Sequence, residues 1–504
     1  MKIVFLGNYT QELIAKQLEK VCNNNITINI EVSGYNQYQQ EIINIDSLLY
    51  STSPNIVFLS LDFFTLIEDV IYQNNNADCF LEKIERRIDE TLVLIKRLSY
   101  NLSTAQIFID NFFLFRPIIM GTIEYNSSLS ISEFSNIANA KLISLANSLS
   151  NLKIIDVLAL TISKDSDFLF DERMYYLAKC HWSFSGVKAI SCLYQRYLNA
   201  FSGKRKKCLV LDLDNTLWGG IIGDDGINGV MLSNDGQGKA FYDFQREILK
   251  LYERGVILAI CSKNSEDIAL EAIEKHPHML LRKKHFVNLK INWNNKAQNI
   301  KEIAQEINIG LDSIVFLDDS SFEREIVTSN LPEVFVPELP TEPSEYPNFI
   351  RNLNVFDSLT LSQGDFSRND SYKANIKRDV LKTEAINIED FYFSLNMRAS
   401  ISKINESQIN RIAQMTQKTN QFNLRTKRYT ESDIKFFVGN SNYDVYQMSL
   451  KDKFGDNGII ACAIIRKQKL EAFVDSFILS CRAMGRTAET ALINYIIEDL
   501  SKTS

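Results

Sequence analysis

The stretch Cys208–Gly220, which reads CLVLDLDNTLWGG, decides how the central part of this chain folds. Its first four residues are all apolar, and a short apolar run bounded by turn residues is typical of a fully buried strand. Two acids follow at once, Asp212 and Asp214. Carboxylates that come together at the end of a buried strand are costly unless a cation lies between them. The stretch therefore predicts a divalent metal site, and Mg²⁺ prefers such hard oxygen ligands, shared with a substrate phosphate.

Three further segments follow in an order that supports this interpretation. The apolar run Val256–Ser262, VILAICS, ends in a hydroxyl, and Lys296 follows in NWNNKAQNI. The next apolar run, Ser313–Ser320 or SIVFLDDS, ends in Asp318 and Asp319. Because strands and helices alternate, the carboxyl ends of the strands should meet at one edge of a parallel sheet, where open α/β folds bind ligands. Without these companions, the first stretch would be interpreted as a strand end with an Asx turn and a glycine turn.

This order of motifs resembles the haloacid dehalogenase (HAD) superfamily, and the resemblance implies a role for each residue. Asp212 would attack phosphorus, since aspartate forms an aspartyl-phosphate intermediate. Asp214 would protonate the leaving oxygen and then deprotonate the hydrolytic water. Ser262 and Lys296 would hold the phosphoryl oxygens as negative charge builds on them. The implied metal ligands are four carboxylates: Asp212, Asp214, Asp318 and Asp319.

Composition is that of an ordinary globular protein, with 45% hydrophobic and 23% charged residues. A length of 504 residues predicts about three domains. The net charge of −7 does not favour nucleic acid or an anionic membrane as partner, and no apolar run is long enough to span a bilayer. The eight cysteines show no C-x-x-C spacing, so we expect a cytoplasmic protein with reduced thiols.

Residues 1–203 show an α/β pattern, with strands predicted at the N-terminus, at Asn55–Leu61 and at Gln106–Phe115. The first strand and the late His181 resemble the SGNH hydrolases. This chain has Asn8 where that family has its nucleophilic serine, and Ala178 where it has an aspartate three residues before the histidine. A histidine with neither partner lacks the logic of a catalytic triad. We expect a packing histidine in a degenerate domain that serves as a scaffold or docking surface.

Residues 204–340 form the predicted HAD-like domain. Its insertion before Val256 is too small for a separate cap domain, which would leave the pocket open to a bulky substrate or another protein. Five of the eight prolines of the chain lie between positions 332 and 347, and they predict a linker or a wrapping loop. Residues 341–387 are expected to connect the domains.

Residues 388–504 form the predicted C-terminal domain, in which strands precede the turn Cys481–Thr487, CRAMGRT, and a helix from Ala488. Free backbone N–H groups and the helix dipole at such a turn form an anion site. The turn resembles the acyl-CoA site of the GNAT N-acyltransferases, with Thr487 where that family prefers glycine or alanine. The resemblance implies a site for a phosphopantetheine arm that includes Arg482, Gly485 and Arg486.

Together, the stretches DLDNTLWGG, AICSKN, FLDDSSFERE, TNQFNL, FGDNG and SCRAMGR resemble the FkbH-like proteins over nearly the whole chain. The resemblance implies an enzyme that dephosphorylates D-1,3-bisphosphoglycerate and loads the glyceryl group as a thioester onto an acyl carrier protein in polyketide-type biosynthesis. Such a transfer needs a thiolate beside the pantetheine groove. Cys481, which precedes the turn, is the candidate. Cys261 is the rival, although alternation along the strand directs it away from the face that Ser262 lines.

The sequence thus predicts a multidomain α/β protein, in which a central HAD-type, Rossmann-like parallel sheet is flanked by an SGNH-like α/β domain and a GNAT-like α+β domain. Two other functions stay open: a plain Mg²⁺-dependent phosphatase whose C-terminal domain only binds, and a non-catalytic docking scaffold for a carrier protein. Also open are which phosphate the HAD site removes and whether dephosphorylation precedes transfer.

Overall fold

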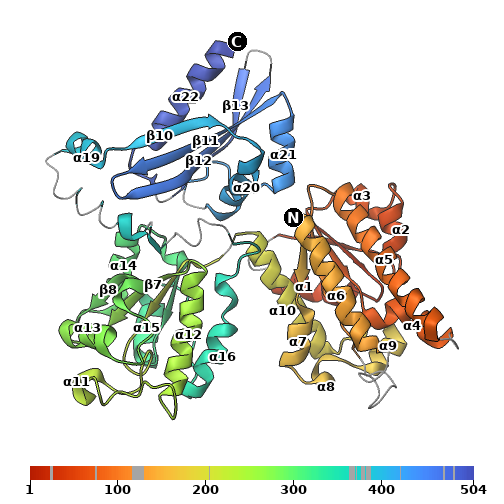
Figure 1. Ribbon diagram of the computed structural model, residues 1–504, viewed down its shortest axis with the longest axis horizontal. Helices are drawn as coiled ribbons and strands as arrows, with labels where there is room; N and C mark the ends of the chain where they lie inside the picture. Colours follow the sequence, from red (N-terminus) through yellow and green to blue (C-terminus); the bar gives the residue numbers. More distant parts are fainter. Residues whose placement is uncertain are drawn as a thin grey trace. The chain divides into compact units, whose positions relative to one another are not determined.

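The computed structural model describes residues 1–22, 27–73, 77–115, 130–203, 205–361, 369–370, 372–375, 378, 381, 387–419, 422–468, 471–480 and 483–503. These residues form three separate sheets, two of them parallel and one antiparallel (Figure 1). The chain divides into two compact units, Met1–Asn199 with Tyr429–Phe436, and Ala200–Arg428 with Phe437–Ser504. The prediction of a multidomain α/β protein is confirmed.

The first unit contains a five-stranded parallel sheet in the order β2-β1-β3-β4-β5. The central strand β3 (Ile56–Ser60) is buried along its whole length, as its continuous apolar sequence requires. The other strands are β1 (Lys2–Gly7), β2 (Asn29–Val32), β4 (Gln106–Asp110) and β5 (Leu152–Ile155). The helices are α1 (Glu12–Cys22), α2 (Tyr38–Ile43), α3 (Leu48–Thr52), α4 (Phe63–Gln73), α5 (Ala77–Asn101), α6 (Ile131–Ser148), α7 (Val157–Ser163), α8 (Ser166–Leu169), α9 (Glu172–Ala178) and α10 (Phe184–Phe201).

Strand β4 ends at Asp110, five residues before the end of the predicted strand. The side chain of the next residue, Asn111, turns to the start of α7, where its Oδ1 accepts hydrogen bonds from the backbone N–H groups of Val157 at 2.9 Å and Leu158 at 3.1 Å. Phe112 is buried in the apolar core. The apolar run therefore continues past the strand because it packs in the core, not because it pairs in the sheet.

The second unit contains a four-stranded parallel sheet in the order β8-β7-β6-β9. Strand β6 (Cys208–Leu211) lies between two neighbours and is fully buried. The other strands are β7 (Ile257–Ser262), β8 (Phe286–Ile291) and β9 (Ile314–Leu317). The helices around this sheet are α11 (Ile222–Asp225), α12 (Lys239–Glu253), α13 (Glu266–Lys275), α14 (Lys296–Ile307), α15 (Ser321–Asn330) and α16 (Tyr346–Arg351). The sheet order brings the carboxyl ends of β6, β7 and β9 together.

The proline-rich segment wraps around this domain. Leu339 and Tyr346 of this segment, together with Ile350 and Phe356 just after it, belong to the apolar core that the sheet shares with α12. The ring of Tyr346 meets Phe241 and Phe244 of α12 edge-on, with centroids 5.9 and 5.3 Å apart. The core of the central domain therefore extends beyond the predicted boundary at residue 340. Much of the rest of the predicted connecting segment lies outside the described residues.

The C-terminal sheet is antiparallel, in the order β10-β11-β12-β13. Its strands are β10 (Arg398–Lys403), β11 (Tyr443–Asp452), β12 (Gly455–Gln468) and β13 (Glu471–Leu479), and its helices are α19 (Ile388–Leu395), α20 (Ile409–Lys418) and α22 (Ala488–Thr503). Helix α21 (Glu431–Gly439) belongs, up to Phe436, to the first unit. The turn between β11 and β12 comprises Lys453 and Phe454, because β12 begins at Gly455, which pairs with Asp452. In the described part of the chain, no helix has the length and apolar character needed to cross a bilayer.

Candidate active site

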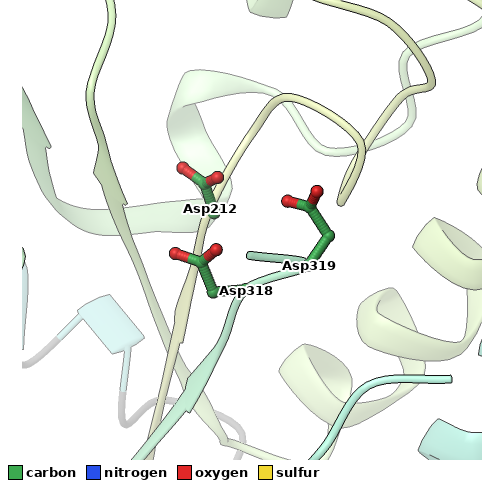
Figure 2. A group of neighbouring side chains, drawn as sticks. All are labelled: Asp212, Asp318 and Asp319. Atoms are coloured by element: carbon green, nitrogen blue, oxygen red, sulfur yellow. The ribbon is translucent and has the colours of Figure 1, made fainter. Parts of the chain in front are cut away.

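Three carboxylates meet at the carboxyl end of the central parallel sheet. Strands β6 and β9 pair with Leu211 opposite Leu317, so the next residues, Asp212 and Asp318, lie side by side. Each of these two acids and Asp319 offers one oxygen within 4.8 Å of the others (Figure 2). Asp212 and Asp318 are buried. The structure thus brings together three of the four predicted metal ligands.

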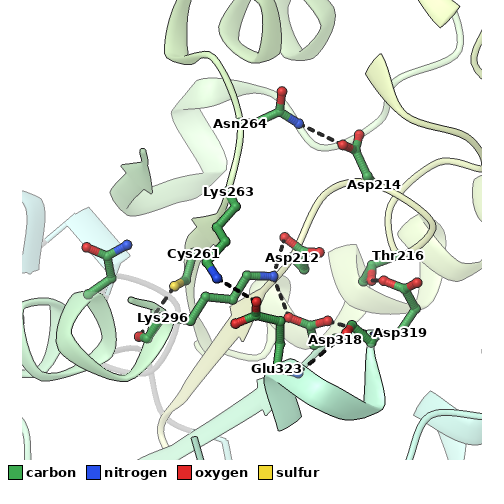
Figure 3. Close-up of polar contacts among 12 residues, drawn as sticks. Asp212, Asp214, Thr216, Cys261, Lys263, Asn264, Lys296, Asp318, Asp319 and Glu323 are labelled. Atoms are coloured by element: carbon green, nitrogen blue, oxygen red, sulfur yellow. Dashed lines mark hydrogen bonds and ion pairs between the residues drawn. The ribbon is translucent and has the colours of Figure 1, made fainter. Parts of the chain in front are cut away.

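Lys296 lies against two of these acids. It is the first residue of α14, and its Nζ is 3.1 Å from Asp212 Oδ1 and 2.5 Å from Asp318 Oδ2 (Figure 3). Burial alone would lower the pKa of Lys296, but the two carboxylates overcome this effect and raise the pKa above its ordinary value. Lys296 therefore stays protonated and keeps a positive charge at the centre of the acidic cluster.

The cluster has the properties expected of a divalent cation site. Burial and the neighbouring charge of Asp212 raise the pKa values of Asp318 and Asp319, so ionising all three acids is unfavourable without a further cation. Asp212 Oδ1 is buried, and apart from its ion pair with Lys296 it has no hydrogen-bond partner among the described residues. A buried, unsatisfied carboxylate oxygen beside two other carboxylates fits Mg²⁺, which binds one or two carboxylates and keeps positions for water or phosphate.

Asp214 is not part of this group. Its Oδ1 accepts hydrogen bonds from Trp218 Nε1 at 2.8 Å and from the backbone N–H of Ile222 at 3.1 Å. Its Oδ2 accepts one from Asn264 Nδ2 at 2.9 Å (Figure 3). Burial raises the pKa of Asp214, which favours a proton-transfer role. The structure therefore does not bring the Asp214 carboxylate into the cluster of the other three predicted metal ligands.

Strand β7 supplies two residues with different surroundings. Ser262, at its end, is buried at the edge of the sheet where the acids lie. Cys261 belongs to the apolar core with Val210 and Ala259, and its Sγ contacts the carbonyl oxygen of Lys296 at 3.7 Å. Burial raises the pKa of the Cys261 thiol to about 12, so this residue is a poor nucleophile.

Arg324 and Asn264 support the site, and the sequence analysis assigned neither of them a role. Arg324 Nη1 donates to the backbone carbonyl oxygens of Asp318 at 2.8 Å and Asp319 at 2.7 Å, which fixes the turn that carries both acids. Asn264 orients Asp214. Both lie within six residues of a predicted site residue, but nothing in their spacing indicates that their side chains turn back to the site.

The predicted pantetheine site is described only in part, since Cys481 and Arg482 lie outside the described residues. Gly485 is exposed, with φ of +71°, a conformation that favours glycine. Arg486 is buried, and its guanidinium donates to Asp452 Oδ2 at 3.0 Å and Asn375 Oδ1 at 2.9 Å. Its guanidinium is therefore not presented to an incoming pantetheine arm, contrary to the sequence-based prediction, because it forms an internal ion pair.

His181 of the first unit has the surroundings of a packing residue. It is fully buried, and its ring contacts those of Tyr9 and Phe115 at centroid distances of 4.2 and 4.6 Å. Neither ring nitrogen has a hydrogen-bond partner among the described residues, and burial lowers the pKa of His181 to about 3. Asn8 bonds to the backbone of Asp62 in both directions, at 2.8 and 2.9 Å. Among the described residues, nothing near His181 activates it for catalysis.

The comparisons with known proteins agree with this architecture. The family model described as the FkbH N-terminal domain matches residues 2–194. The crystal structure of the N-terminal part of the protein BF1531 from Bacteroides fragilis, containing a phosphatase domain complexed with Mg, is 31% identical. The match covers 72% of this chain and 95% of that chain, with a TM-score of 0.67.

Other matches are weaker. The ribosomal-protein-S18-alanine N-acetyltransferase from Escherichia coli is 18% identical over 21% of this chain and 61% of that chain, and its TM-score of 0.17 is too low to compare the folds. No curated protein matches the chain. The family match at the N-terminus and the 31% identity to the Bacteroides fragilis protein over most of the chain show that the chain belongs to the FkbH-like family.

Proposed function

We propose that the chain is a Mg²⁺-dependent phosphatase and glyceryltransferase, which dephosphorylates D-1,3-bisphosphoglycerate and loads the glyceryl group onto an acyl carrier protein. The phosphatase half rests on one observation, the cluster of Asp212, Asp318 and Asp319 around Lys296 at the end of a parallel sheet. The similarity of the chain to the Bacteroides fragilis structure, which contains a phosphatase domain complexed with Mg, also supports the phosphatase activity. The transferase half rests on the resemblance of the sequence to the family.

The residues of the site fit phosphoryl transfer. Asp212 would attack the phosphorus of the ester phosphate, so that the ester P–O bond breaks as a P–O bond to Asp212 forms. Asp214 would donate a proton to the departing oxygen, and would then take a proton from the water that cleaves the aspartyl phosphate. Lys296 and Ser262 would hold the phosphoryl oxygens. When bound between the three acids, Mg²⁺ would offset the negative charge of the phosphoryl group.

The transfer half needs an accessible thiol. Of the six cysteines described as free, five are buried, and Cys192 of α10 is exposed. Burial raises the pKa of Cys180 to about 11 and that of Cys462 to about 12, which suppresses their thiolates. Burial thus argues against the five buried cysteines, and the position of Cys481 directly before the turn favours it over the exposed Cys192 as the acyl-bearing residue. Gly485 and the start of α22 would offer backbone N–H groups to the pantetheine arm, whereas Arg486 would act inside the domain.

The alternative is a plain Mg²⁺-dependent phosphatase whose C-terminal domain only binds. One observation favours it: the guanidinium of Arg486, implied to contact the pantetheine arm, forms a buried ion pair with Asp452. The carboxylate cluster argues against the scaffold hypothesis. Buried carboxylates that repel one another lower the stability of the fold, so we expect such a cluster in a site that binds a metal and not in a docking surface.

Intact-protein mass spectrometry tests the proposal. The protein would be mixed with Mg²⁺, enzymatically generated 1,3-bisphosphoglycerate and a phosphopantetheinylated carrier protein. A glyceryl mass on the carrier is expected, and none with Asp212→Asn. A glyceryl adduct on the enzyme should disappear with Cys481→Ala and persist with Cys192→Ala. Phosphate release without a glyceryl mass on either protein would exclude the transferase and leave the phosphatase.

A further inference from the structure

A second ion pair spans the end of the central strand. Lys263 follows β7 directly, and Glu323 lies in the first turn of α15, after β9. Their side chains meet with Lys263 Nζ 2.6 Å from Glu323 Oε1 (Figure 3). Since β6 lies between β7 and β9 in the sheet, this pair bridges the end of the strand that is followed by Asp212. The pair therefore lies at the same edge of the sheet as Asp212.

Neither partner is fully satisfied by the other. The Lys263 side chain is 34% exposed, and within the described part of the chain its ammonium pairs with Glu323 alone. An ammonium has three donors, so two are left for another acceptor. Glu323 is about nine-tenths buried, and its Oε2 has no hydrogen-bond partner in the described part of the chain. If this ion pair had only a structural role, the remaining donors of Lys263 and the second oxygen of Glu323 would be expected to have hydrogen-bond partners in the protein.

Glu323 is also held in place by the turn that carries the acids. Its backbone N–H donates to Ser320 Oγ at 3.4 Å, and the backbone N–H of Ser320 donates to Asp318 Oδ1 at 2.9 Å. The carboxylate that holds Lys263 is thus fixed relative to the acidic cluster. This arrangement keeps the ammonium of Lys263 at the carboxyl end of the sheet and partly open to solvent.

The charges of the site require a cation besides Lys296. Asp212, Asp318 and Asp319 carry three negative charges, and Lys296 already contacts two of these acids. A divalent cation would bring the cluster to neutrality, and a phosphoryl group would then use the remaining positions on that cation. Any further anionic group on the substrate would meet carboxylates unless another cation faced it. Of the described side chains that follow β7, Lys263 is the cation in that position.

We propose that Lys263 binds a second anionic group of the substrate, and that Glu323 positions its ammonium for this contact. The substrate class is a phosphate monoester that carries another anion, a carboxylate or a second phosphate, a few bonds from the ester. This inference rests on the proposed phosphatase function and adds the selectivity of its pocket. Lys263 is a specificity-determining residue here, and the bond-breaking step belongs to Asp212 and Asp214.

The test compares two substrates of similar size, 3-phosphoglycerate and glycerol 3-phosphate, which differ by a carboxylate. The quantity measured, with Mg²⁺ present, is kcat/KM for 3-phosphoglycerate divided by kcat/KM for glycerol 3-phosphate. For Lys263→Met this ratio should fall by about tenfold to a hundredfold, the range expected for losing a hydrogen bond between charged groups. Lys263→Arg should restore most of the ratio, because it keeps the charge. The matched control is Lys275→Met, which breaks an exposed pair with Glu271 at the far end of α13.

The outcomes separate the inference from the proposed function. If the unaltered protein hydrolyses neither compound nor 1,3-bisphosphoglycerate, the phosphatase function fails. If it hydrolyses them and Lys263→Met lowers both kcat/KM values equally, the pair is structural and the inference fails. Should Lys263→Met fail to fold, Lys263→Gln keeps the polarity and length of the side chain. An unchanged ratio in that variant would equally overturn the inference.

Discussion

Arg324 shows how the backbone around the acids is fixed. Its guanidinium donates to the carbonyl oxygens of two consecutive residues, Asp318 and Asp319, and so holds the turn in one conformation. Metal affinity depends on such supporting contacts, whose loss typically weakens binding tenfold to a hundredfold. Arg324 is thus a positioning residue, which acts through the acids without touching the substrate.

We expect Arg324→Met to raise the dissociation constant for Mg²⁺ by about tenfold, because the turn loses its two charge-assisted hydrogen bonds. Isothermal titration with Mg²⁺ measures this without turnover. The control is Arg246→Met, whose guanidinium pairs with Asp243 on the exposed side of α12. Equal Mg²⁺ affinity in the two variants would show that the turn keeps its conformation without Arg324.

The residues of the site differ in how far the sequence reveals them. Asp212, Asp318 and Lys296 could be predicted because each lies directly at the end of a strand or the start of a helix, where the chain itself sets the position. Asn264 and Arg324 could not, since their roles depend on how a loop or a helical turn directs a side chain back to the site. The buried ion pair of Arg486 depends on Asp452, which is 34 residues away, at the end of β11.

Asp110 makes the first unit sensitive to pH. It is buried at the end of β4, where Ser60 Oγ and Tyr194 Oη donate hydrogen bonds to it, the latter at 2.7 Å. Burial raises the pKa of Asp110 to about 7. The folded state therefore holds a proton that the unfolded state releases near pH 4. Its stabilising contribution is complete below that pH and is lost as the pH rises through 7.

We expect the free energy of opening β4, taken relative to that of Asp110→Asn, to fall by on the order of 1.4 kcal/mol per pH unit between about pH 4 and pH 7, because the opposite contribution of buried His181 is common to both proteins. Hydrogen exchange followed by mass spectrometry, corrected for the intrinsic exchange rate, measures this on the intact protein. Asp110→Asn should remove the contribution of Asp110 and so shift the slope upward by this amount, whereas the exposed control Asp165→Asn should keep the slope of the unaltered protein. The same slope in Asp110→Asn would mean that another group titrates.

At the scale of elements, α16 closes the central domain. Tyr346 is buried against α12, and its hydroxyl donates to the carbonyl oxygen of Asn215 at 3.2 Å, within the loop that follows Asp212. The helix thus connects the wrapping segment with the loop of the site. Edge-on aromatic contacts and burial both contribute to holding it there.

We expect Tyr346→Phe to lower the free energy of unfolding by about 1 kcal/mol, since one hydrogen bond is lost. Tyr346→Ala should cost about 3 kcal/mol or more, because it also leaves a cavity against Phe241 and Phe244. Chemical denaturation followed by the fluorescence of Trp218, which is buried in the same core, reports both changes. Equal costs for the two variants would show that α16 does not pack as described.

The strands that the sequence analysis did not find share a physical reason. These are β2, β5, β8 and β10, and each is an edge strand of its sheet, although the other edge strands β9 and β13 were predicted from their apolar residues. An edge strand has one neighbour and leaves part of its length in solvent, so it needs no continuous apolar run. Strand β10, RASISK, is exposed over most of its residues. Central strands such as β3 and β6 are buried on both faces and were therefore recognised from their composition.

At the scale of the whole molecule, the C-terminal domain is stabilised by a buried charge network. The side chain of Asp452 is fully buried between Arg378 and Arg486, and its oxygens lie 2.7 and 3.0 Å from their guanidinium groups. Although burial opposes it, Arg378 holds the pKa of Asp452 below its ordinary value. The acid therefore joins the segment that carries Arg378 to the turn before α22.

We expect Asp452→Asn to lower the free energy of unfolding of this domain by about 3–5 kcal/mol, because two buried guanidinium groups lose their counter-charge. Hydrogen exchange of β11 and α22 reports the effect. Lys451→Met, which removes an exposed ion pair with Asp456, should change the free energy of unfolding by less than about 1 kcal/mol. Comparable exchange in the two variants would show that the network contributes little.

The measurement that tests the central claim most directly is Mg²⁺-dependent release of phosphate by the intact protein and by Asp212→Asn, with 1,3-bisphosphoglycerate as substrate and its spontaneous hydrolysis subtracted. The account predicts release with Mg²⁺, none with excess EDTA, and a loss of about a thousandfold or more in Asp212→Asn, since the variant lacks the attacking carboxylate. Release by Asp212→Asn at the rate of the unaltered protein would contradict the account, as would release that does not depend on Mg²⁺.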